Sequence, residues 1–294
     1  MKRVAVIAHS KKTIGGGLPE LRRRLDERDG IDVMWYEVPK SAKAGKRARA
    51  AAKEGADLVL VWGGDGSVQQ CIDALAGTGV TLAILPAGTA NLFATNIGVP
   101  SSIEEALDIA FNGKRATLDA GVVNGEHFAV MSGTGFDARM IGMVSGKTKR
   151  RLGRVAYVWT GLKAARAKPM SITVDADGST WFSGEATCLL VANVPKVIGG
   201  MEVFPDADPE NGTLEVGLVT AHGLGQWAKV LMDVVGGHAD TARYVHRTRA
   251  RDLNVKTKGS QPYELDGGAR PATKELHFSI EPDAITVMVP DGTR

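Results

Sequence analysis

Leu58–Trp62 is a short apolar run that reads as a buried strand, and it leads directly into a glycine turn, Gly-Gly-Asp-Gly-Ser, at residues 63–67. Glycines permit positive φ and let backbone N–H groups converge without interference from a Cβ atom. A helix that starts right after such a turn adds a favourable potential for an anion. The turn therefore predicts a phosphate-binding loop, in which Ser67 caps the helix or donates to a phosphate oxygen.

Asp65 is unusual in such a loop because a carboxylate repels phosphate. A bound metal ion, or the positioning of an attacking hydroxyl, would resolve that conflict. The alternative is an ordinary strand-to-helix turn that an aspartate caps.

A second turn of the same kind follows the next apolar run. Ile84 and Leu85 lead into Pro-Ala-Gly-Thr-Ala-Asn at residues 86–91. Turns after successive parallel strands lie at the same edge of a sheet, where open α/β sheets bind ligands. The chain has neither the Walker pattern nor the Gly-x-Gly-x-x-Gly dinucleotide pattern. Gly15–Gly17, near Lys11 and Lys12, forms either a third phosphate-facing loop or a flexible surface turn.

Strands and helices alternate over the first 120 or so residues. We expect strands at 3–8, 31–38, 57–62 and 82–85, and helices at 18–28, 42–54, 67–76, 91–96 and 103–111. Continuously apolar strands separated by helices indicate a parallel sheet that is covered on both faces. The first domain, residues 1–122, is therefore predicted to be a doubly wound, mostly parallel α/β domain.

The pattern changes after about residue 122. Asn124-Gly125 and Asp177-Gly178 are hairpin signals, and Asn211-Gly212 precedes another strand. Expected strands are 122–123, 127–131, 171–174, 180–191, 214–219, 253–257, 276–281 and 285–289, with a helix over Arg150–Ala167. The fold class is thus α/β plus β: residues 123–294 form a mainly antiparallel β-sandwich, whose last strand is able to return to the first domain.

Charge and composition exclude several classes of protein. The formal net charge is only +3, and the basic stretches lack interleaved aromatic residues, so no nucleic-acid partner is expected. The apolar runs are too short to span a bilayer. Met1-Lys2-Arg3 leads straight into a strand without a signal-peptide pattern, and Cys71 and Cys188 are far apart, so we expect a cytoplasmic protein with two buried thiols.

The basic residues are unevenly distributed. Residues 138–174 hold nine Lys or Arg and no Asp or Glu. Residues 147–154, Lys-Thr-Lys-Arg-Arg-Leu-Gly-Arg, predict transient contact with an anionic membrane surface, the alternative being a solvated helix end. Four more arginines, Arg243, Arg247, Arg249 and Arg251, form a second cluster with the same two interpretations.

The ordered motifs resemble the diacylglycerol kinase catalytic-domain family, bacterial soluble lipid kinases related to sphingosine kinase and distantly to NAD kinase. Both glycine turns match family segments in order along the chain. The further matching segments are Gly133–Ala138, Asn193–Pro195, Gly199-Gly200, Pro205–Ala207, Asn211–Leu214 and Leu265–Gly267. The resemblance spans nearly the whole chain.

The resemblance implies an ATP- and Mg²⁺-dependent kinase with its active cleft between the two domains, at the inner face of the membrane, with a diacylglycerol-like lipid as substrate and a homodimer as the assembly. Asp65 and Asp266 are the implied catalytic residues. The implied nucleotide contacts are His9, Ser10, Lys11, Lys12, Thr13, Gly63, Gly64, Asp65, Gly66, Ser67, Gly88, Thr89 and Asn91, with the stretch to Gln70. Asp206, with carbonyls of Val203 and Asp208, is implied to hold a structural Mg²⁺, and Asp119 to join a network behind the active-site Mg²⁺.

The chain departs from the family pattern at several positions. Gly268 stands where the family places a glutamate thought to be the general base, and Leu92 where aspartate is frequent. Gln70 replaces a glutamate, and His9-Ser10 replaces Asn-Pro. Either Asp65 or Asp266 orients the acceptor hydroxyl instead of residue 268, or transfer activity has been lost.

Three functions are therefore compared. The first is an ATP-dependent lipid kinase that converts diacylglycerol or a similar alcohol into phosphatidic acid or an analogue. The second is an NAD kinase-like enzyme, which shares Gly-Gly-Asp-Gly. The third is a catalytically impaired regulator that binds a nucleotide or a lipid. The sequence does not identify the lipid acceptor.

Overall fold

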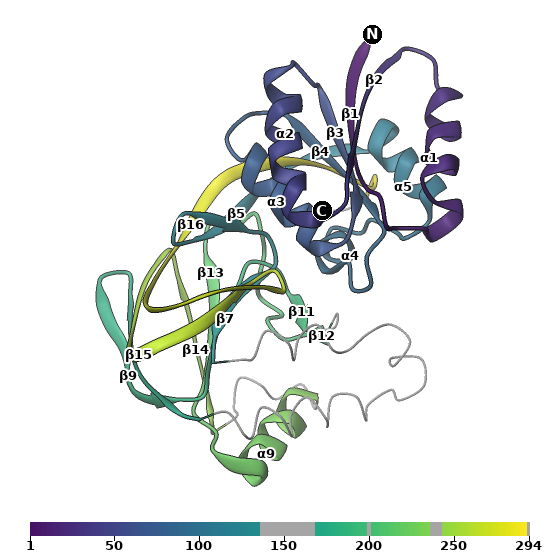
Figure 1. Ribbon diagram of the computed structural model, residues 1–294. Helices are drawn as coiled ribbons and strands as arrows, with labels where there is room; N and C mark the ends of the chain where they lie inside the picture. The colour runs from purple at the N-terminus through teal and green to yellow at the C-terminus, as the bar shows by residue number, and fades with distance from the viewer. Residues whose placement is uncertain (136–167, 199–200, 236–242, 293–294) are drawn as a thin grey trace. The chain divides into compact units, whose positions relative to one another are not determined.

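The computed structural model describes residues 1–135, 168–198, 201–235 and 243–292. Its contacts divide the chain into two units (Figure 1). Unit 1 contains Met1–Ala120 and Pro282–Arg294, and unit 2 contains Gly121–Glu281. The expected helix over Arg150–Ala167 lies outside the described residues. None of the described helices is both long and apolar enough to cross a membrane.

Unit 1 is built on a parallel sheet. Its strands are β1 (Lys2–His9), β2 (Ile31–Val38), β3 (Leu58–Gly63), β4 (Thr81–Pro86) and the end of β16 (Gly268–Val289), in the order β16-β4-β3-β1-β2. Every residue of β3 and β4 is buried. Strands can be apolar throughout only when both faces are covered, which is the reason for the continuous apolar runs in the sequence.

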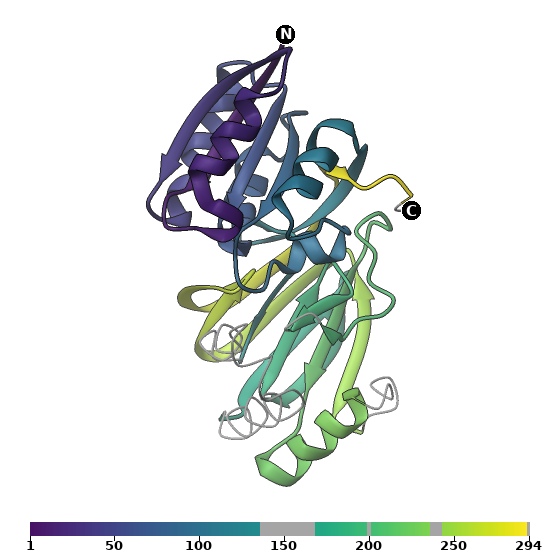
Figure 2. The same cartoon turned by 90° about the vertical axis from the view of Figure 1, so that its right-hand side faces the viewer.

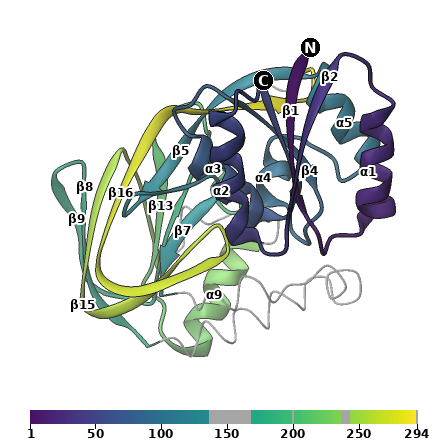
Figure 3. The same ribbon diagram turned by 45° about the horizontal axis from the view of Figure 1, so that its top comes forward.

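Helices cover both faces of this sheet. They are α1 (Gly17–Asp26), α2 (Ala44–Lys53), α3 (Asp65–Leu75), α4 (Leu92–Asn96) and α5 (Ile103–Asn112), with short 3₁₀ turns η1 (Ile14–Gly16) and η2 (Ser41–Lys43). Figures 1 and 3 show α1 and α5 on one face and α2 and α3 on the other. The doubly wound architecture expected from the sequence is confirmed.

Unit 2 is mainly antiparallel. The sheet order is β14-β13-β10-β7-β15-β16, with β8 paired to β15, β9 paired to β8, and β6 paired to β5 (Lys114–Val123). The strands are β6 (Glu126–Phe128), β7 (Met131–Thr134), β8 (Met170–Ala176), β9 (Ser179–Ala186), β10 (Cys188–Ala192), β13 (Leu214–Val219), β14 (Val245–Ala250) and β15 (Asp252–Leu265), and a small ribbon pairs β11 (Lys196–Ile198) with β12 (Met201–Glu202). Phe128 and Phe278, which meet edge to face at 6.4 Å, lie in its core.

Several elements differ from the sequence expectation: β11, β12 and β14 are not among the expected strands, and β5 begins at Lys114 rather than at residue 122. The run 180–191 is two strands, β9 and β10, because the Thr187 N–H turns away to the Val219 carbonyl at 2.8 Å. The last two expected strands are one, β16, whose residues belong to both units. Helix α9 (Gly223–Val235) is not predicted from the sequence, which has Gly223 and Gly225 at its start.

Candidate phosphate-binding edge and acidic turn

Three loops meet at one edge of the unit 1 sheet. Strands β1, β3 and β4 are parallel neighbours, with Ala8 opposite Trp62 and Gly63 opposite Pro86. Their carboxyl ends therefore carry the loop after His9, the glycine turn at residues 63–67 and the second turn at residues 88–91. This is the edge at which open α/β sheets bind ligands.

The two glycine turns interlock through their backbones. The Ala87 N–H donates to the Gly63 carbonyl at 2.7 Å. A Cβ atom added to Gly88 would lie 2.5 Å from the Gly64 Cα, and one added to Gly64 would lie 2.9 Å from the Gly88 Cα. Both positions must be glycine for the backbones to approach so closely. Together the turns form a side-chain-free surface of the kind that admits phosphate groups.

Asn91 shapes the second turn. It adopts a left-handed conformation with φ 47°, which asparagine tolerates better than most residues. Its Oδ1 accepts from the Gly88 N–H at 2.8 Å, and its Nδ2 donates to the Gly88 carbonyl at 3.2 Å. Thr89, between them, is exposed. In this geometry Asn91 holds the loop, and Thr89 is the side chain of the turn that solvent or a ligand can reach.

Asp65 braces one glycine turn against the other. Helix α3 begins at Asp65, and its Oδ1 accepts from the Leu92 N–H at 2.6 Å, at the start of α4. Burial raises the pKa of Asp65, while the backbone N–H groups of Leu92, Phe93 and Asn91 act to lower it. Asp65 thus caps the start of α4 and joins the two loops. A capping role is one of the alternatives that the sequence leaves open. Residue 92 takes part through its backbone, which leucine supplies as well as aspartate.

Ser67 is buried rather than exposed at the helix start. Its N–H donates to the Gly64 carbonyl at 2.8 Å and its Oγ donates to the Ser41 Oγ at 3.1 Å. The residue that caps α3 is Gly64. Ser41, in η2, was not singled out from the sequence. A hydroxyl pair next to exposed Gly66 is a hydrogen-bonding surface that only the fold brings together.

The loop after β1 supplies positive charge. Lys11 is exposed and Lys12 is half-buried, and the Lys12 N–H donates to the His9 carbonyl at 3.0 Å. Burial, Lys12 and Lys11 lower the pKa of His9, whose Nδ1 accepts from the Lys11 N–H at 3.3 Å. The surroundings of His9 therefore favour the neutral imidazole. Ser10 and Thr13 are exposed in the same loop.

Gly15, Gly16 and Gly17 continue this loop into α1 with φ values of 59°, 93° and 70°. Only glycine adopts three such conformations in a row at low cost. The three glycines therefore form a turn of defined backbone conformation.

Asp266 is fixed inside unit 2. Its carboxylate accepts from the backbone N–H groups of Ala129, Val130 and Met131 at 2.8, 2.9 and 2.9 Å. The residue is 8% exposed and has a φ of 46° at the tip of the β15–β16 hairpin. Both carboxylate oxygens are engaged, so in this structure Asp266 fastens the hairpin tip to β7 and its preceding turn, and does not present a carboxylate to an acceptor hydroxyl.

Gly268 lies where a side chain has little room. A Cβ atom added there would lie 2.9 Å from the Arg270 Nη1. Arg270 pairs with Glu126 at 2.8 Å and donates to the Gly268 carbonyl at 3.2 Å. A side chain at position 268 would therefore require the Arg270 guanidinium to shift.

Glu264 was missed by the sequence analysis. It is 0% exposed, and its Oε2 accepts from the Gly267 N–H at 3.1 Å. No donor in the described part of the chain reaches Oε1. Burial, and then the charge of Asp266, raises the pKa of Glu264 to about 8. The available signal was a glutamate between the core residues Tyr263 and Leu265.

The expected structural Mg²⁺ ligands do not fit a divalent cation. The Asp206 carboxylate pairs with Arg249 at 3.4 Å, and Arg247 donates to the Val203 carbonyl at 3.5 Å. Asp208 is used within its own turn, because its Oδ1 accepts from the Glu210 N–H at 3.0 Å and its carbonyl from the Asn211 N–H at 3.2 Å. Two guanidinium groups already supply positive charge here, and they would repel Mg²⁺.

Asp119 also has a backbone partner. It is 7% exposed, and its Oδ1 accepts from the Asp283 N–H at 3.0 Å. Among the described residues, no three His, Cys, Asp or Glu side chains group as a metal site. The acidic network expected from the resemblance stays a prediction for Asp119.

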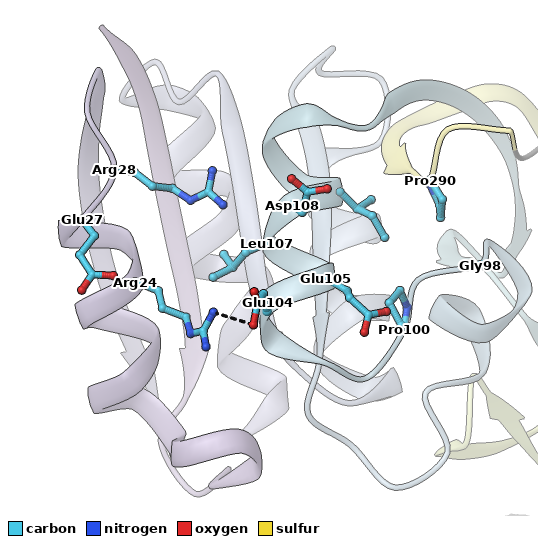
Figure 4. A pocket seen from close by; sticks show the side chains of 11 residues that line it. Arg24, Glu27, Arg28, Gly98, Pro100, Glu104, Glu105, Leu107, Asp108 and Pro290 are labelled. Atoms are coloured by element: carbon cyan, nitrogen blue, oxygen red, sulfur yellow. Dashed lines mark ion pairs between the residues drawn. The ribbon is translucent and has the colours of Figure 1, made fainter.

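A groove of about 790 Å³ lies elsewhere in unit 1, between α1 and α5 (Figure 4). Arg24 and Glu104 face each other across it at 3.5 Å. None of the residues predicted to bind a nucleotide lines this groove. It is therefore a groove between two helices that is separate from the predicted nucleotide residues.

The basic segment 147–154 lies outside the described residues, as do Phe136–Ala138 and Gly199-Gly200 of the family motifs. In the second basic cluster, Arg247 donates to the Val203 carbonyl. Arg249 forms ion pairs with Asp206 and Glu215. Arg243 and Arg251 are exposed.

Solved structures share this architecture. A diacylglycerol kinase from Bacillus anthracis is 21% identical with a TM-score of 0.76, covering 100% of this chain and 98% of that chain. An NAD kinase from Archaeoglobus fulgidus, solved in complex with ATP, is 12% identical with a TM-score of 0.55, covering 98% and 94%. These likenesses establish the fold, including the β-sandwich nature of unit 2.

Sequence relatives establish the family. The diacylglycerol kinase catalytic domain family matches residues 3–123, and the YegS C-terminal NAD kinase beta sandwich-like domain matches residues 130–289. A Bacillus subtilis diacylglycerol kinase is 27% identical over 245 residues, 82% of this chain and 80% of that protein. A Yersinia pestis protein named "Probable lipid kinase YegS-like" is 30% identical over 298 residues, 99% of this chain and 98% of that protein. The chain belongs to the family of diacylglycerol kinases and YegS-like lipid kinases.

Proposed function

We propose that the protein transfers the γ-phosphoryl group of ATP to the hydroxyl of diacylglycerol or a similar lipid alcohol, giving phosphatidic acid or its analogue. The proposal that ATP binds at this edge rests on the interlocked pair of turns at Gly64 and Gly88, beside the lysines of the β1 loop. The lipid acceptor is supported by the relatives named diacylglycerol kinase.

Three features of the edge suit a nucleotide polyphosphate. Backbone surfaces without side chains admit the phosphates, Lys11 and Lys12 neutralise charge, and Thr89 offers an exposed hydroxyl. ATP as the donor is supported by the related fold of an NAD kinase that binds it. Mg²⁺ would arrive with ATP as part of the substrate.

Phosphoryl transfer through a loose transition state depends mainly on positioning and charge neutralisation. The alcohol oxygen attacks the γ-phosphorus, the bond to ADP breaks, and the hydroxyl proton passes to a phosphate oxygen or to solvent. We assign Asp65 and Asp266 to positioning, because each carboxylate is held by backbone N–H groups that fix a loop. A strong base at position 268 is then not essential for transfer.

The protein would meet its substrate at the inner face of the membrane as a peripheral protein. We propose that the basic segment 147–154 contacts anionic lipid and that the protein forms a homodimer. We propose no nucleic-acid partner.

The test is ATP-dependent phosphorylation of diacylglycerol in anionic mixed micelles with Mg²⁺, with Asp65→Asn in parallel. Transfer by the wild type alone supports the proposal. NADP formation from NAD without lipid phosphorylation would favour the NAD kinase alternative. ATP binding without turnover of any lipid alcohol would favour a regulator.

A further inference from the structure

Helix α9 carries apolar side chains on two different faces. Trp227 and Val230 are each 4% exposed, whereas Leu224 is 58% and Met232 is 67% exposed. Within the described ranges, the other exposed large hydrophobic residues are Met1 and Ile14. Two of these four side chains therefore lie on one helix of 13 residues.

The exposed residues form a stripe. Leu224, Ala228 and Met232 are spaced four residues apart, so they lie along one side of the helix, and Ala228 is exposed too. From Val230 through Trp227 to Met232 the apolar arc covers about 200°, roughly twice what a core-facing surface helix requires. On one side of this arc Trp227 and Val230 are buried, and on the other side the Leu224 stripe (Leu224, Ala228 and Met232) is exposed.

Positive charge lies on α9, and an arginine and an aromatic residue lie beside the chain that enters it. Lys229 is exposed on α9 itself. The Thr220 N–H donates to the Tyr244 carbonyl at 2.9 Å, which places Tyr244 beside the chain that enters α9. The Arg243 guanidinium lies 5.9 Å from the Tyr244 ring centre and is exposed. The acidic residue of the helix, Asp233, is half-buried and about 140° around the helix from Ala228.

Helix α9 lies at one end of unit 2. Figures 1 and 2 show α9 at the end of unit 2, beyond the ends of β13 and β14. Exposed apolar side chains together with Lys, Arg and Tyr are typical of helices and loops at a membrane–water interface.

We propose that α9 docks on an anionic lipid bilayer by inserting the Leu224 stripe between the acyl chains, with Lys229 and Arg243 at the level of the headgroups. A second protein copy is a weaker candidate, because two large side chains and an alanine offer far less than the roughly 800 Å² that each partner buries in a stable dimer. This inference rests on the proposed function, since a kinase of bilayer lipids must reach their headgroups.

The first experiment measures binding of the full chain, without ATP, to sedimenting vesicles of phosphatidylcholine with phosphatidylglycerol, and of phosphatidylcholine alone. Leu224→Gln with Met232→Gln removes the apolar stripe without adding charge, and we expect binding to fall about tenfold or more. Leu224→Met with Met232→Leu is the matched control and keeps wild-type binding. Lys229→Gln weakens binding about fivefold on the anionic vesicles only, whereas Lys53→Gln, on exposed α2 surface, has no effect.

A second readout separates docking from catalysis. The double glutamine variant keeps the wild-type rate on a monomeric short-chain diacylglycerol and loses rate on vesicle-embedded diacylglycerol. If the wild type phosphorylates no lipid, the proposed function fails while the vesicle measurement still stands.

Two results would overturn the docking inference. One is unchanged vesicle binding of the double glutamine variant, or no vesicle binding by the wild type. The other is a wild-type dimer, seen by light scattering, that the double glutamine variant dissociates while vesicle binding stays the same.

Discussion

Asp65 is the residue whose role the structure changes most. A carboxylate in a phosphate loop is unfavourable if it faces the phosphate, but Asp65 turns to the Leu92 N–H and joins two loops. The apparent conflict in the sequence is therefore resolved by a backbone partner 27 residues away, which no local pattern reveals.

We expect Asp65→Asn to reduce transfer at least about a hundredfold while the protein stays folded. The asparagine Oδ1 still accepts from the Leu92 N–H, so the melting temperature should move by no more than a few degrees, but the negative charge that would orient the Mg²⁺ of the bound ATP or the acceptor hydroxyl is gone. Rates on diacylglycerol and thermal unfolding measure the two effects. A fully active variant with native stability would remove Asp65 from the mechanism.

Gly88→Ala tests the interlock of the two turns. The new Cβ atom would lie 2.5 Å from the Gly64 Cα, so the turns must separate. We expect ATP affinity to fall about tenfold or more, together with a lower melting temperature. Gly259→Ala is the control, since a Cβ atom there meets nothing within 4 Å. ATP binding by calorimetry that is equal in both variants would contradict the role of the interlock.

Among the elements, the turn before β13 is fastened by arginines of β14. Arg249 contacts both Asp206 and Glu215, and the Glu215 side chain is only 5% exposed. We expect this arrangement to replace the Mg²⁺ site that the resemblance implies, because Arg249 already pairs with the Asp206 carboxylate. The sequence displayed the acidic turn and the arginine cluster separately, and the pairing of β13 with β14 brings them together.

Arg249→Met should lower the melting temperature, because it leaves the buried Glu215 carboxylate without its partner. Adding Glu215→Gln should restore part of that loss. Neither millimolar Mg²⁺ nor a chelator should change the melting temperature of the wild type without ATP. A rise in melting temperature with Mg²⁺ alone would contradict the replacement.

Much of the secondary structure could be predicted, for an identifiable reason. β3 and β4 are apolar along their whole length and end in glycine turns, so their type and ends are marked in the sequence. Helix α9 was missed because Gly223 and Gly225 stand at its start, and its identity depends on the packing of Trp227 and Val230. Residues 180–191 were read as one strand because the break at Thr187 is a hydrogen bond to Val219, a contact that sequence patterning does not show.

In the molecule as a whole, the sequence predicts the positions of the loops of the candidate site. It does not predict the partners of the carboxylates. Glycine patterns report local backbone shape, so residues 63–67 and 88–91 were located correctly at one sheet edge. Whether Asp65, Asp206 or Asp266 is available depends on partners distant in the chain, and each has one. Glu264, the carboxyl with an unpaired oxygen among the described residues, was hidden in a strand pattern.

Glu264 makes the stability of the folded protein depend on pH. Burial raises its pKa from the model-peptide value of 4.5 to about 8, so the folded state keeps a proton that the unfolded chain loses. Glu264 therefore contributes fully to the free energy of unfolding below about pH 4.5. This contribution is lost as the pH rises to about 8.

Glu264→Gln removes this dependence because the amide stays neutral at every pH. The difference in melting temperature between Glu264→Gln and the wild type should be small at pH 5 and should reach several degrees in favour of the variant by pH 8 to 9. Exposed Glu185→Gln is the control and should show no such trend. Thermal unfolding across this range measures it, and a difference that stays constant with pH would mean that Glu264 ionises in the folded state as it does in water.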